Sequence, residues 1–208
     1  MTRFRDVLKD KNFFFLWLGQ VVSEVGDWLN AVAVLAMTIE FAGPARAGVA
    51  VAIYAVARHL PIFLFGPIAG VLVDRWNRRS VMIVADIVRA LLALGFVVAA
   101  QRKSLAAIYV VGAALFCVAA FFNAAKRASI PRLVSGTNAL LSANSLTAST
   151  TATTLAVGSA LGGMLVSVTG RDAVFITNAF SFLLYRGNPS MRLFNRHTLG
   201  TRAKRRFE

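Results

Sequence analysis

The chain has 208 residues, of which 57% are hydrophobic and 15% are charged, and its formal net charge is +14. Soluble domains normally carry about 25% charged residues, so this composition argues against a water-soluble domain. The basic residues lie between apolar stretches rather than along one soluble face, which argues against a nucleic-acid-binding surface. This distribution is typical of a membrane protein.

Five apolar stretches are each long enough for a helix that crosses the bilayer, which needs about 20 residues for ~30 Å of hydrocarbon. These predicted spans are residues 13–41, 47–73, 81–100, 105–125 and 140–168. A sixth apolar run, residues 174–184, has only 11 residues. As a helix it would cover about 16 Å. The sequence therefore predicts an all-α membrane protein, with one transmembrane bundle over residues 13–184 and an incomplete sixth helix.

Basic residues are divided unevenly between the two sides of these spans. With the N-terminus in the cytoplasm, the inside segments hold 10 of them and the outside connections hold 4, before the C-terminal tail is counted. The inside residues are Arg3, Arg5, Lys9, Lys11, Arg75, Arg78, Arg79, Lys126, Arg127 and Arg132, and the outside residues are Arg46, Arg102, Lys103 and Arg171. Because cytoplasmic loops carry the excess of Lys and Arg, we expect a multi-pass protein of the inner (plasma) membrane with residues 1–12 in the cytoplasm. The first span is too long for a signal-peptide core, so no cleavage is expected.

The connections between the predicted spans are short. Residues 42–46, 74–80 and 101–104 force neighbouring helices to run antiparallel and adjacent. Residues 126–139 are a longer connection, in which Pro131 blocks a continuous helix, and we expect this segment to lie along the inner surface. The single cysteine, Cys117, excludes an intrachain disulfide.

A weak internal repeat occurs at an offset of 93 residues. Gly70-Val-Leu-Val aligns with Gly163-Met-Leu-Val, and Arg78 aligns with Arg171. Two inverted copies of three helices are a feature of secondary transporters. The alternative explanation is a shared membrane composition, which also produces matches between apolar segments.

Polar residues form a stripe along the first span, about 120° wide on a helical wheel. Its members are Gln20, Ser23, Glu24, Asp27 and Asn30. A carboxylate at mid-membrane costs roughly 2.5–3.5 kcal/mol on insertion scales, so such residues pair, take up protons or line a polar cavity. We predict proton coupling for the two acids and a substrate cavity for the other three residues. The alternative is an ion pair that only locks two helices together.

Further charged residues lie in the second and third spans. Arg58, about 12 residues into the second span, is the predicted cationic partner of the two acids. His59 titrates near neutral pH in water, although an intramembrane histidine more often serves as a helix-packing hydrogen-bond donor. Asp86 and Arg89 are three residues apart on one helix face, which predicts an intrahelical pair with a structural or gating role.

The fifth span contains a run of small residues, Gly158-Ser-Ala-Leu-Gly162-Gly163, which predicts close packing against another helix at all three glycines. Residues 147–154 just before it are rich in hydroxyl groups. These groups either bond to their own helix backbone or face a polar cavity, and the pattern allows both.

The residues Gly70-Val-Leu-Val-Asp74-Arg75-Trp-Asn-Arg78-Arg79 resemble the signature loop between helices two and three of the major facilitator superfamily, with Asn77 where many members have Gly. Further matches are similar to the branch that includes enterobactin-type siderophore exporters and macrolide efflux proteins. These matches are Trp17-Leu-Gly19-Gln20, Ser23, Gly26-Asp27, Arg58-x-x-Pro61 and Asp86-x-x-Arg89. The fifth-span glycine run resembles the family's antiporter motif, with Ser159 in place of its usual Pro.

The resemblance covers about residues 10–184, the N-terminal six-helix half of a twelve-helix fold. It implies proton-driven export of small amphipathic molecules by alternating access. It also implies that Glu24, Asp27 and Arg58 face the central cavity. The same resemblance assigns a gating loop to Gly70, Asp74, Arg75, Arg78 and Arg79.

The sequence after residue 184 cannot continue a span, because Tyr185-Arg-Gly-Asn-Pro-Ser-Met-Arg is polar and contains Pro189. We hypothesise a frameshift or similar lesion near Tyr185, which would make residues 185–208 a non-native or disordered basic tail. The alternative is a natural juxtamembrane tail that binds anionic lipid headgroups.

The predicted function is that of an incomplete fragment of a proton-coupled exporter. Its predicted partners are the lipid bilayer, a small-molecule substrate, protons and a missing C-terminal half. One alternative is a half-size transporter that acts as a homodimer, and another is a nontransporting membrane scaffold or receptor. The sequence shows no nucleotide-binding loop, metal-ligand cluster or nucleophile–base arrangement, so we predict no enzyme, no cofactor, no metal site and no nucleic-acid partner.

Overall fold

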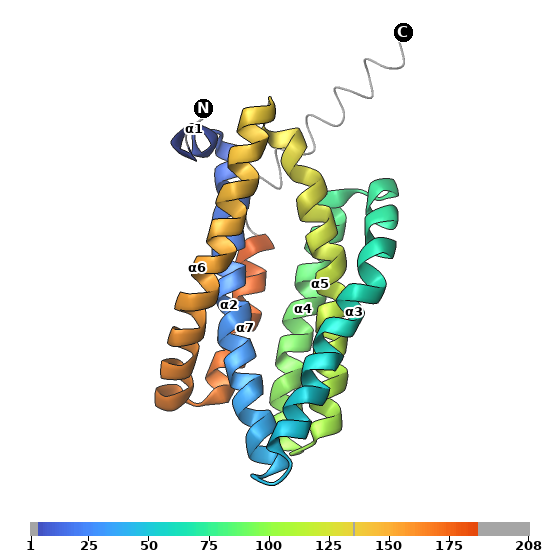
Figure 1. Ribbon diagram of the computed structural model, residues 1–208, viewed down its shortest axis with the longest axis vertical. Coiled ribbons are helices and arrows are strands. Elements are labelled where there is room, and N and C mark those ends of the chain that lie inside the picture. The colour runs from blue at the N-terminus through green and yellow to red at the C-terminus, as the bar shows by residue number, and fades with distance from the viewer. Residues whose placement is uncertain (1–3, 135, 187–208) are drawn as a thin grey trace.

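The computed structural model describes residues 4–134 and 136–186. Within these residues every regular element is a helix, which confirms the all-α prediction. The elements are α1 (Phe4–Leu8), α2 (Lys11–Ala42), α3 (Ala47–Arg75), α4 (Arg78–Gln101), α5 (Leu105–Leu133), α6 (Thr137–Thr169) and α7 (Arg171–Arg186). Successive long helices run in opposite directions along the bundle, and α1 lies at the N-terminal end of α2 (Figure 1).

Helices α2 to α6 are long and apolar enough to cross a membrane, as predicted for five spans. The helices continue past their apolar stretches into polar flanks. For example, α4 begins at Arg78 rather than at residue 81, because Asn77 caps it. The Asn77 side-chain oxygen accepts hydrogen bonds from the backbone N–H groups of Arg79 (3.1 Å) and Ser80 (3.4 Å). An asparagine here therefore satisfies two of the orphan donors at a helix start.

The prediction for residues 126–139 is wrong, because α5 runs without interruption to Leu133. Pro131 lies inside its last turn, where the missing N–H removes a single backbone bond and the ring need not break the helix. The segment predicted to lie on the inner surface thus includes a helix end. Its first residue, Lys126, is buried inside the bundle.

Helix α7 has 16 residues and carries Asp172 in its first turn. At 1.5 Å per residue it is about 24 Å long, which is longer than the predicted apolar run but shorter than the five spanning helices. Of the predicted basic tail, residues 187–208 lie outside the described residues.

The set of main helix contacts is the same when the first three long helices are exchanged with the last three, which we call the exchange pattern. The main contacts join α3 to α5, α2 to α6, α4 to α5, α2 to α7 and α4 to α7. If α2, α3 and α4 are exchanged with α5, α6 and α7, this set of pairs maps onto itself. Two inverted three-helix repeats require such a pattern, so the packing supports the repeat seen at an offset of 93 residues.

Two apolar clusters occupy the two ends of the bundle. On α2 the first cluster includes residues up to Leu16 and the second begins at Leu29. On α4 the corresponding residues are Ala85 and Phe96. Glu24 and Asp27 of α2 and Asp86 and Arg89 of α4 fall between these limits, so the bundle has a polar layer within its apolar interior.

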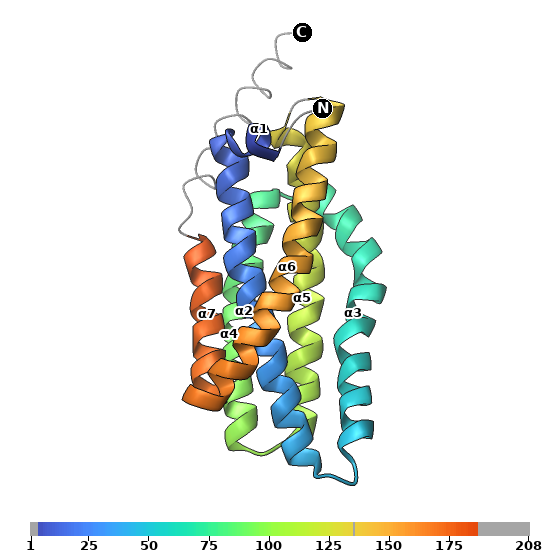
Figure 2. The same ribbon diagram turned by 60° about the vertical axis from the view of Figure 1, so that its left-hand side comes forward.

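Helices α3 and α6 are the least covered. Only 17% of the apolar window of each is buried, against 33–39% for α2, α4 and α5. In Figure 2, α3 lies at one edge of the bundle, beside α5. These two helices therefore have the largest faces that no other described helix covers.

Candidate functional site

Arg89 of α4 lies at the centre of the polar layer. Its guanidinium donates a 2.6 Å hydrogen bond to Asp27 of α2, and its other terminal nitrogen lies 3.6 Å from Asp86. The guanidinium also lies over the rings of Phe182 (4.1 Å to the centroid) and Phe122 (5.1 Å). Arg89 is 3% exposed and Asp86 is fully buried. One cation is therefore shared by two carboxylates from two helices.

The predicted pair of Asp86 and Arg89 is present. The shorter contact of Arg89, however, is with Asp27 of α2 and not with Asp86 of its own helix, α4. Neither carboxylate oxygen of Asp86 accepts a hydrogen bond among the described residues. Asp27 therefore has the better geometry for the shared guanidinium, and Asp86 is the weaker competitor.

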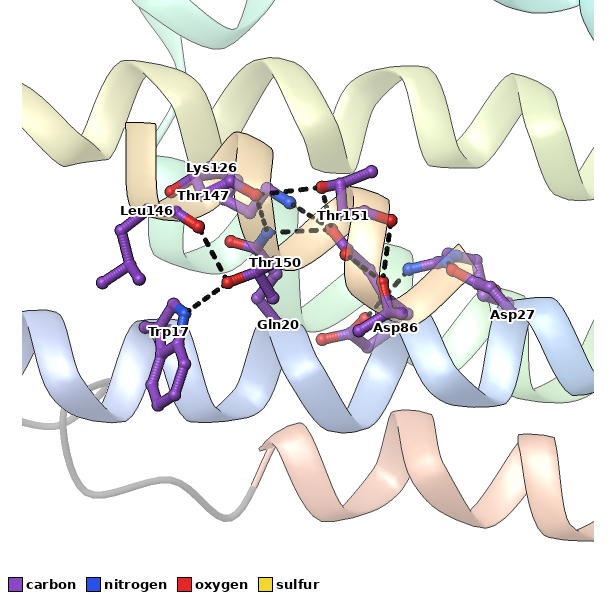
Figure 3. Close-up of polar contacts among 12 residues, drawn as sticks. Trp17, Gln20, Asp27, Asp86, Lys126, Leu146, Thr147, Thr150 and Thr151 are labelled. Atoms are coloured by element: carbon purple, nitrogen blue, oxygen red, sulfur yellow. Dashed lines mark hydrogen bonds and ion pairs between the residues drawn. The ribbon is translucent and has the colours of Figure 1, made fainter. Parts of the chain in front are cut away.

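Glu24 lies in a second cluster, where α2, α5 and α6 meet. Its carboxylate is 3.5 Å from the Lys126 ammonium of α5. It also accepts hydrogen bonds from Gln20 (2.9 Å), Thr151 (3.1 Å) and Thr154 (2.9 Å). Figure 3 shows the side chains of Gln20, Lys126 and Thr151 close to one another. The partly exposed carboxylate of Glu24 therefore has an ammonium and three hydrogen-bond donors around it.

Hydroxyl groups of α6 tie this cluster to α2. The Trp17 indole donates to the Thr150 hydroxyl at 2.7 Å, and that hydroxyl donates to the Leu146 carbonyl at 2.8 Å (Figure 3). The single hydroxyl hydrogen of Thr151 has two acceptors at 3.1 Å, the Thr147 carbonyl and the Glu24 carboxylate. The first alternative, bonding to their own helix backbone, is therefore observed, and Thr150 and Thr151 also contact polar side chains of α2. The second alternative, a polar cavity, stays a prediction.

Arg58 is not the cationic partner of Glu24 or Asp27, so that prediction is wrong. Its guanidinium lies over the rings of Phe116 (4.5 Å to the centroid) and Trp28 (5.5 Å), and its buried Nε has no hydrogen-bond partner. The partners are Lys126 and Arg89 instead. A helical wheel places residues on a face, but it does not say which neighbouring helix supplies the opposite charge.

The other predicted cavity residues, Gln20, Ser23 and Asn30, are buried. The side-chain oxygen of Asn30 has no hydrogen-bond partner among the described residues. Two further buried polar residues, Asn178 and Ser181 of α7, were missed by the sequence analysis. Their signal was polarity within a short apolar run that was assigned no role.

Close helix approaches support the layer. A Cβ at Gly158 of α6 would lie 2.8 Å from the Trp28 Cβ, and a Cβ at Gly162 would lie 3.2 Å from the Leu29 Cα. These two glycines therefore face α2 closely. The prediction for Gly163 is wrong, because a Cβ there would meet nothing within 4 Å.

The predicted gating loop connects α3 and α4 at the N-terminal end of the bundle. Arg78 binds Asp74 at 3.1 Å and donates a 2.7 Å hydrogen bond to the Ala128 carbonyl of α5. Arg75 is exposed, and a Cβ at Gly70 would meet nothing within 4 Å. The remaining residue of the motif, Arg79, has a buried Nε without a hydrogen-bond partner. Arg78 therefore ties the loop to the end of α5.

At the opposite end of the bundle, α2 and α7 are joined by an ion pair between Glu40 and Arg171. A cavity of about 530 Å³ lies beside this pair, lined also by Gln101 and Asp172.

His59 of α3 is exposed, and its Nδ1 lies 2.8 Å from the Ala55 carbonyl oxygen of the same helix. That contact lies within α3 and joins no second helix, so the helix-packing alternative for His59 stays a prediction.

Comparison with known proteins identifies the family. Residues 6–187 match the family model described as transmembrane secretion effector. An uncharacterized MFS-type transporter, YfiS of Bacillus subtilis, is 29% identical over 84% of this chain and 40% of its own length. The putative bacilysin exporter BacE of Bacillus subtilis is 28% identical over 83% of this chain and 42% of its own length.

A third relative, macrolide efflux protein A of Streptococcus pyogenes, is 35% identical over 38% of this chain and 18% of its own length. No solved structure matches the chain. The chain spans about two fifths of the length of YfiS and BacE. The predicted resemblance is confirmed, and the family consists of membrane transporters rather than enzymes. The chain is therefore a multi-pass membrane protein that belongs to the transmembrane secretion effector family of the major facilitator superfamily and corresponds to its N-terminal half.

Proposed function

We propose that this chain forms one half of a secondary active exporter of small amphipathic molecules, driven by protons and working by alternating access. The observation that carries the proposal is the pair of intramembrane carboxylates, Glu24 and Asp27, each bound to a cation on another helix. An acid with such a partner links protonation to helix contact, because the neutral form loses the ion pair. Intramembrane ionisable groups are the usual elements of proton relays.

Asp27 is the better candidate for coupling. If it takes up a proton, its attraction for Arg89 weakens, and Asp86 is already 3.6 Å from the same guanidinium. Arg89 would then shift its bonding from α2 to its own helix. That exchange loosens α2 from α4, which is the kind of two-state contact that alternating access needs.

Glu24 and the free face of α6 suggest where a substrate passes. Thr151 is exposed and bonds to Glu24, and Asn144, Ser145, Ser149 and Thr153 are also exposed on α6. Polar side chains on the outer face of a spanning helix are costly against lipid. They suit a water-filled pathway, with Gln20, Ser23 and Asn30 behind it as residues that become accessible in another conformation.

Orientation and gating follow the same proposal. The excess of basic residues at the N-terminal end supports an inner-membrane protein with that end in the cytoplasm. There, the Arg78 contacts with Asp74 and with the Ala128 carbonyl would hold the α3–α4 loop against α5 while the cytoplasmic side is closed.

The second half of the pathway comes from a further six-helix unit or from a second copy of this chain. The weakly covered faces of α3 and α6 support such a partner. A nontransporting scaffold is the competing function, and it predicts that neutral variants of Glu24 and Asp27 change folding only.

The proposal is tested with the purified chain in proteoliposomes, with an imposed pH gradient and fluorescent amphipathic dyes that are cationic, neutral and anionic. We expect dye movement that stops when a protonophore collapses the gradient. Asp27→Asn should abolish the gradient-driven part, and the exposed control Arg102→Gln should retain it. A folded chain that moves no dye and releases no protons when dye is added would refute an exporter made of copies of this chain alone. Gradient-driven transport that survives in Asp27→Asn would refute the coupling role.

A further inference from the structure

Arg58 is an intramembrane cation without a carboxylate at ion-pair distance among the described residues, and its charge interacts with Asp27 only at longer range. Six charged residues belong to the middle layer: Glu24, Asp27, Asp86, Arg58, Arg89 and Lys126. The numbers of acids and bases are equal, but the acids are not distributed one to each base. Arg89 takes two carboxylates and Lys126 takes the third, so Arg58 forms no ion pair within the described part of the chain.

The position of Arg58 makes this isolation unusual. It lies on α3 about 16 Å from Ala47 and about 25 Å from Arg75 at 1.5 Å per residue, well inside the span. A cation at such depth is costly and is normally paired. The two ring contacts stabilise it by only about 0.5–2 kcal/mol each. They use no hydrogen bond, so the N–H donors of the guanidinium remain for an acceptor.

Arg58 is partly exposed as a residue, although its Nε is buried. Trp28, Arg58 and Phe116 are each partly exposed, and they come from α2, α3 and α5. Helix α3 is one of the two least covered helices, so this site opens toward a free face. The site therefore has a fixed positive charge, two aromatic walls and an approach from outside the packed interior.

We propose that Arg58, Trp28 and Phe116 form the recognition site for the carboxylate of an amphipathic, monoanionic substrate, an inference that rests on the proposed export function. A planar guanidinium binds a carboxylate through two parallel hydrogen bonds. The two rings contact the apolar body beside that group. A monoanion supplies the Arg58 guanidinium with one counter-charge at contact distance, which no described residue provides.

An anionic lipid carries the same chemistry in its headgroup. Headgroups lie at the membrane surface, while Arg58 lies well inside the span, so the depth favours a substrate that enters the bundle. The binding experiment must still distinguish a carboxylate substrate from an anionic lipid headgroup as the ligand of Arg58.

The experiment measures binding by equilibrium dialysis of the whole chain in phosphatidylcholine nanodiscs. The probes are three aromatic carboxylic acids, such as 1-naphthaleneacetic acid, each with its neutral amide and a cationic amine analogue. We expect each acid to bind about ten- to a hundredfold more tightly than its amide, the range that one charge-assisted hydrogen bond provides. Empty nanodiscs correct for partitioning into lipid.

Three variants assign the preference. Arg58→Gln should bring the acid-to-amide ratio close to one, and Arg58→Lys should give an intermediate ratio because it keeps the charge without the planar donors. The matched control Arg102→Gln loses the same charge outside the membrane and should leave the ratio unchanged. Because Arg58 makes no ion pair, we expect its variants to fold, which their unfolding midpoints check.

Three results would overturn the inference. In the first, acids bind no better than amides. In the second, the preference persists in Arg58→Gln. In the third, phosphatidylglycerol nanodiscs block acid binding through Arg58, which makes the lipid the ligand. Amine or amide binding without acid preference refutes the inference but leaves the export proposal intact. Normal acid preference together with gradient-driven transport that survives in Asp27→Asn refutes the coupling role of Asp27 alone.

Discussion

The two intramembrane arginines have the same kind of aromatic surroundings and opposite electrostatic ones. Arg89 and Arg58 each lie over two rings. Arg89 has in addition two carboxylates and is 3% exposed, whereas Arg58 has no carboxylate and is partly exposed. From this difference we infer that ring contacts can hold a guanidinium within a membrane bundle. Whether nearby carboxylates also bind it then determines whether its charge stabilises the fold or remains available to a ligand.

The largest effect that tests this comparison is expected from Arg89→Met. The substitution keeps a long side chain but leaves the buried Asp27 and Asp86 without their cation. Breaking a buried pair in this way costs about 3–5 kcal/mol. We expect a matching loss in the free energy of unfolding in detergent, and Arg58→Met should change it by less than about 1 kcal/mol. Equal losses in the two variants would remove the distinction between the arginines.

A double substitution sharpens the comparison at the Glu24 cluster. Lys126→Met should destabilise the chain by about 2 kcal/mol, less than Arg89→Met, because three other donors still bind the Glu24 carboxylate. Adding Glu24→Gln should recover at least half of that loss, since no unpaired charge then remains. The measurement is a double-mutant cycle of unfolding free energies. Additive losses would mean that the pair at 3.5 Å is not coupled.

Gly158 tests the wall of the Arg58 site. A Cβ at this position would lie 2.8 Å from the Trp28 Cβ, so Gly158→Ala must move α6 or α2. We expect a cost of about 1–3 kcal/mol in unfolding free energy, as for other overpacked interiors. Gly163→Ala is the matched control on the open side of the same helix, and it should be neutral or stabilising by up to about 1 kcal/mol. Similar losses at both glycines would contradict the packing described for α6.

The smallest effect is expected from Phe116→Leu. Leucine retains an apolar side chain but removes the ring beneath the Arg58 guanidinium. The loss should be about 0.5–1 kcal/mol in unfolding free energy, the contribution of one partly exposed cation–π contact. A loss above about 2 kcal/mol would show that this ring is a packing element of the bundle rather than part of an open site.

Sequence patterns were sufficient for the helices and the family, because hydrophobic length and the α3–α4 loop motif are local features. They also placed Glu24 and Asp27 near the middle of the first span. They did not supply the partners, since pairing depends on which helices touch. Lys126 was missed because Pro131 suggested a loop, and proline near the end of a helix is tolerated. Arg58 was misassigned because equal depth on two helices does not bring two side chains together.

The roles of individual residues were harder to predict from the sequence than their positions along the helices. The spacing of Gly158 and Gly162 matches one helix face, whereas Gly163 is one residue further and points away. Asn178 and Ser181 gave no sequence signal beyond their polarity, because their contact with Gly26 joins residues more than 150 positions apart. Such contacts are set by the arrangement of the whole bundle.

The exchange pattern of helix packing has a consequence for biogenesis. Helices α2, α3 and α4 touch one another little, and their main neighbours are α5, α6 and α7. A ribosome delivers the first three helices to the membrane before those neighbours exist. The early helices must therefore remain loosely associated in the bilayer, with Asp27 and Glu24 tolerated there, until the second trio is inserted and the bundle closes in one late step.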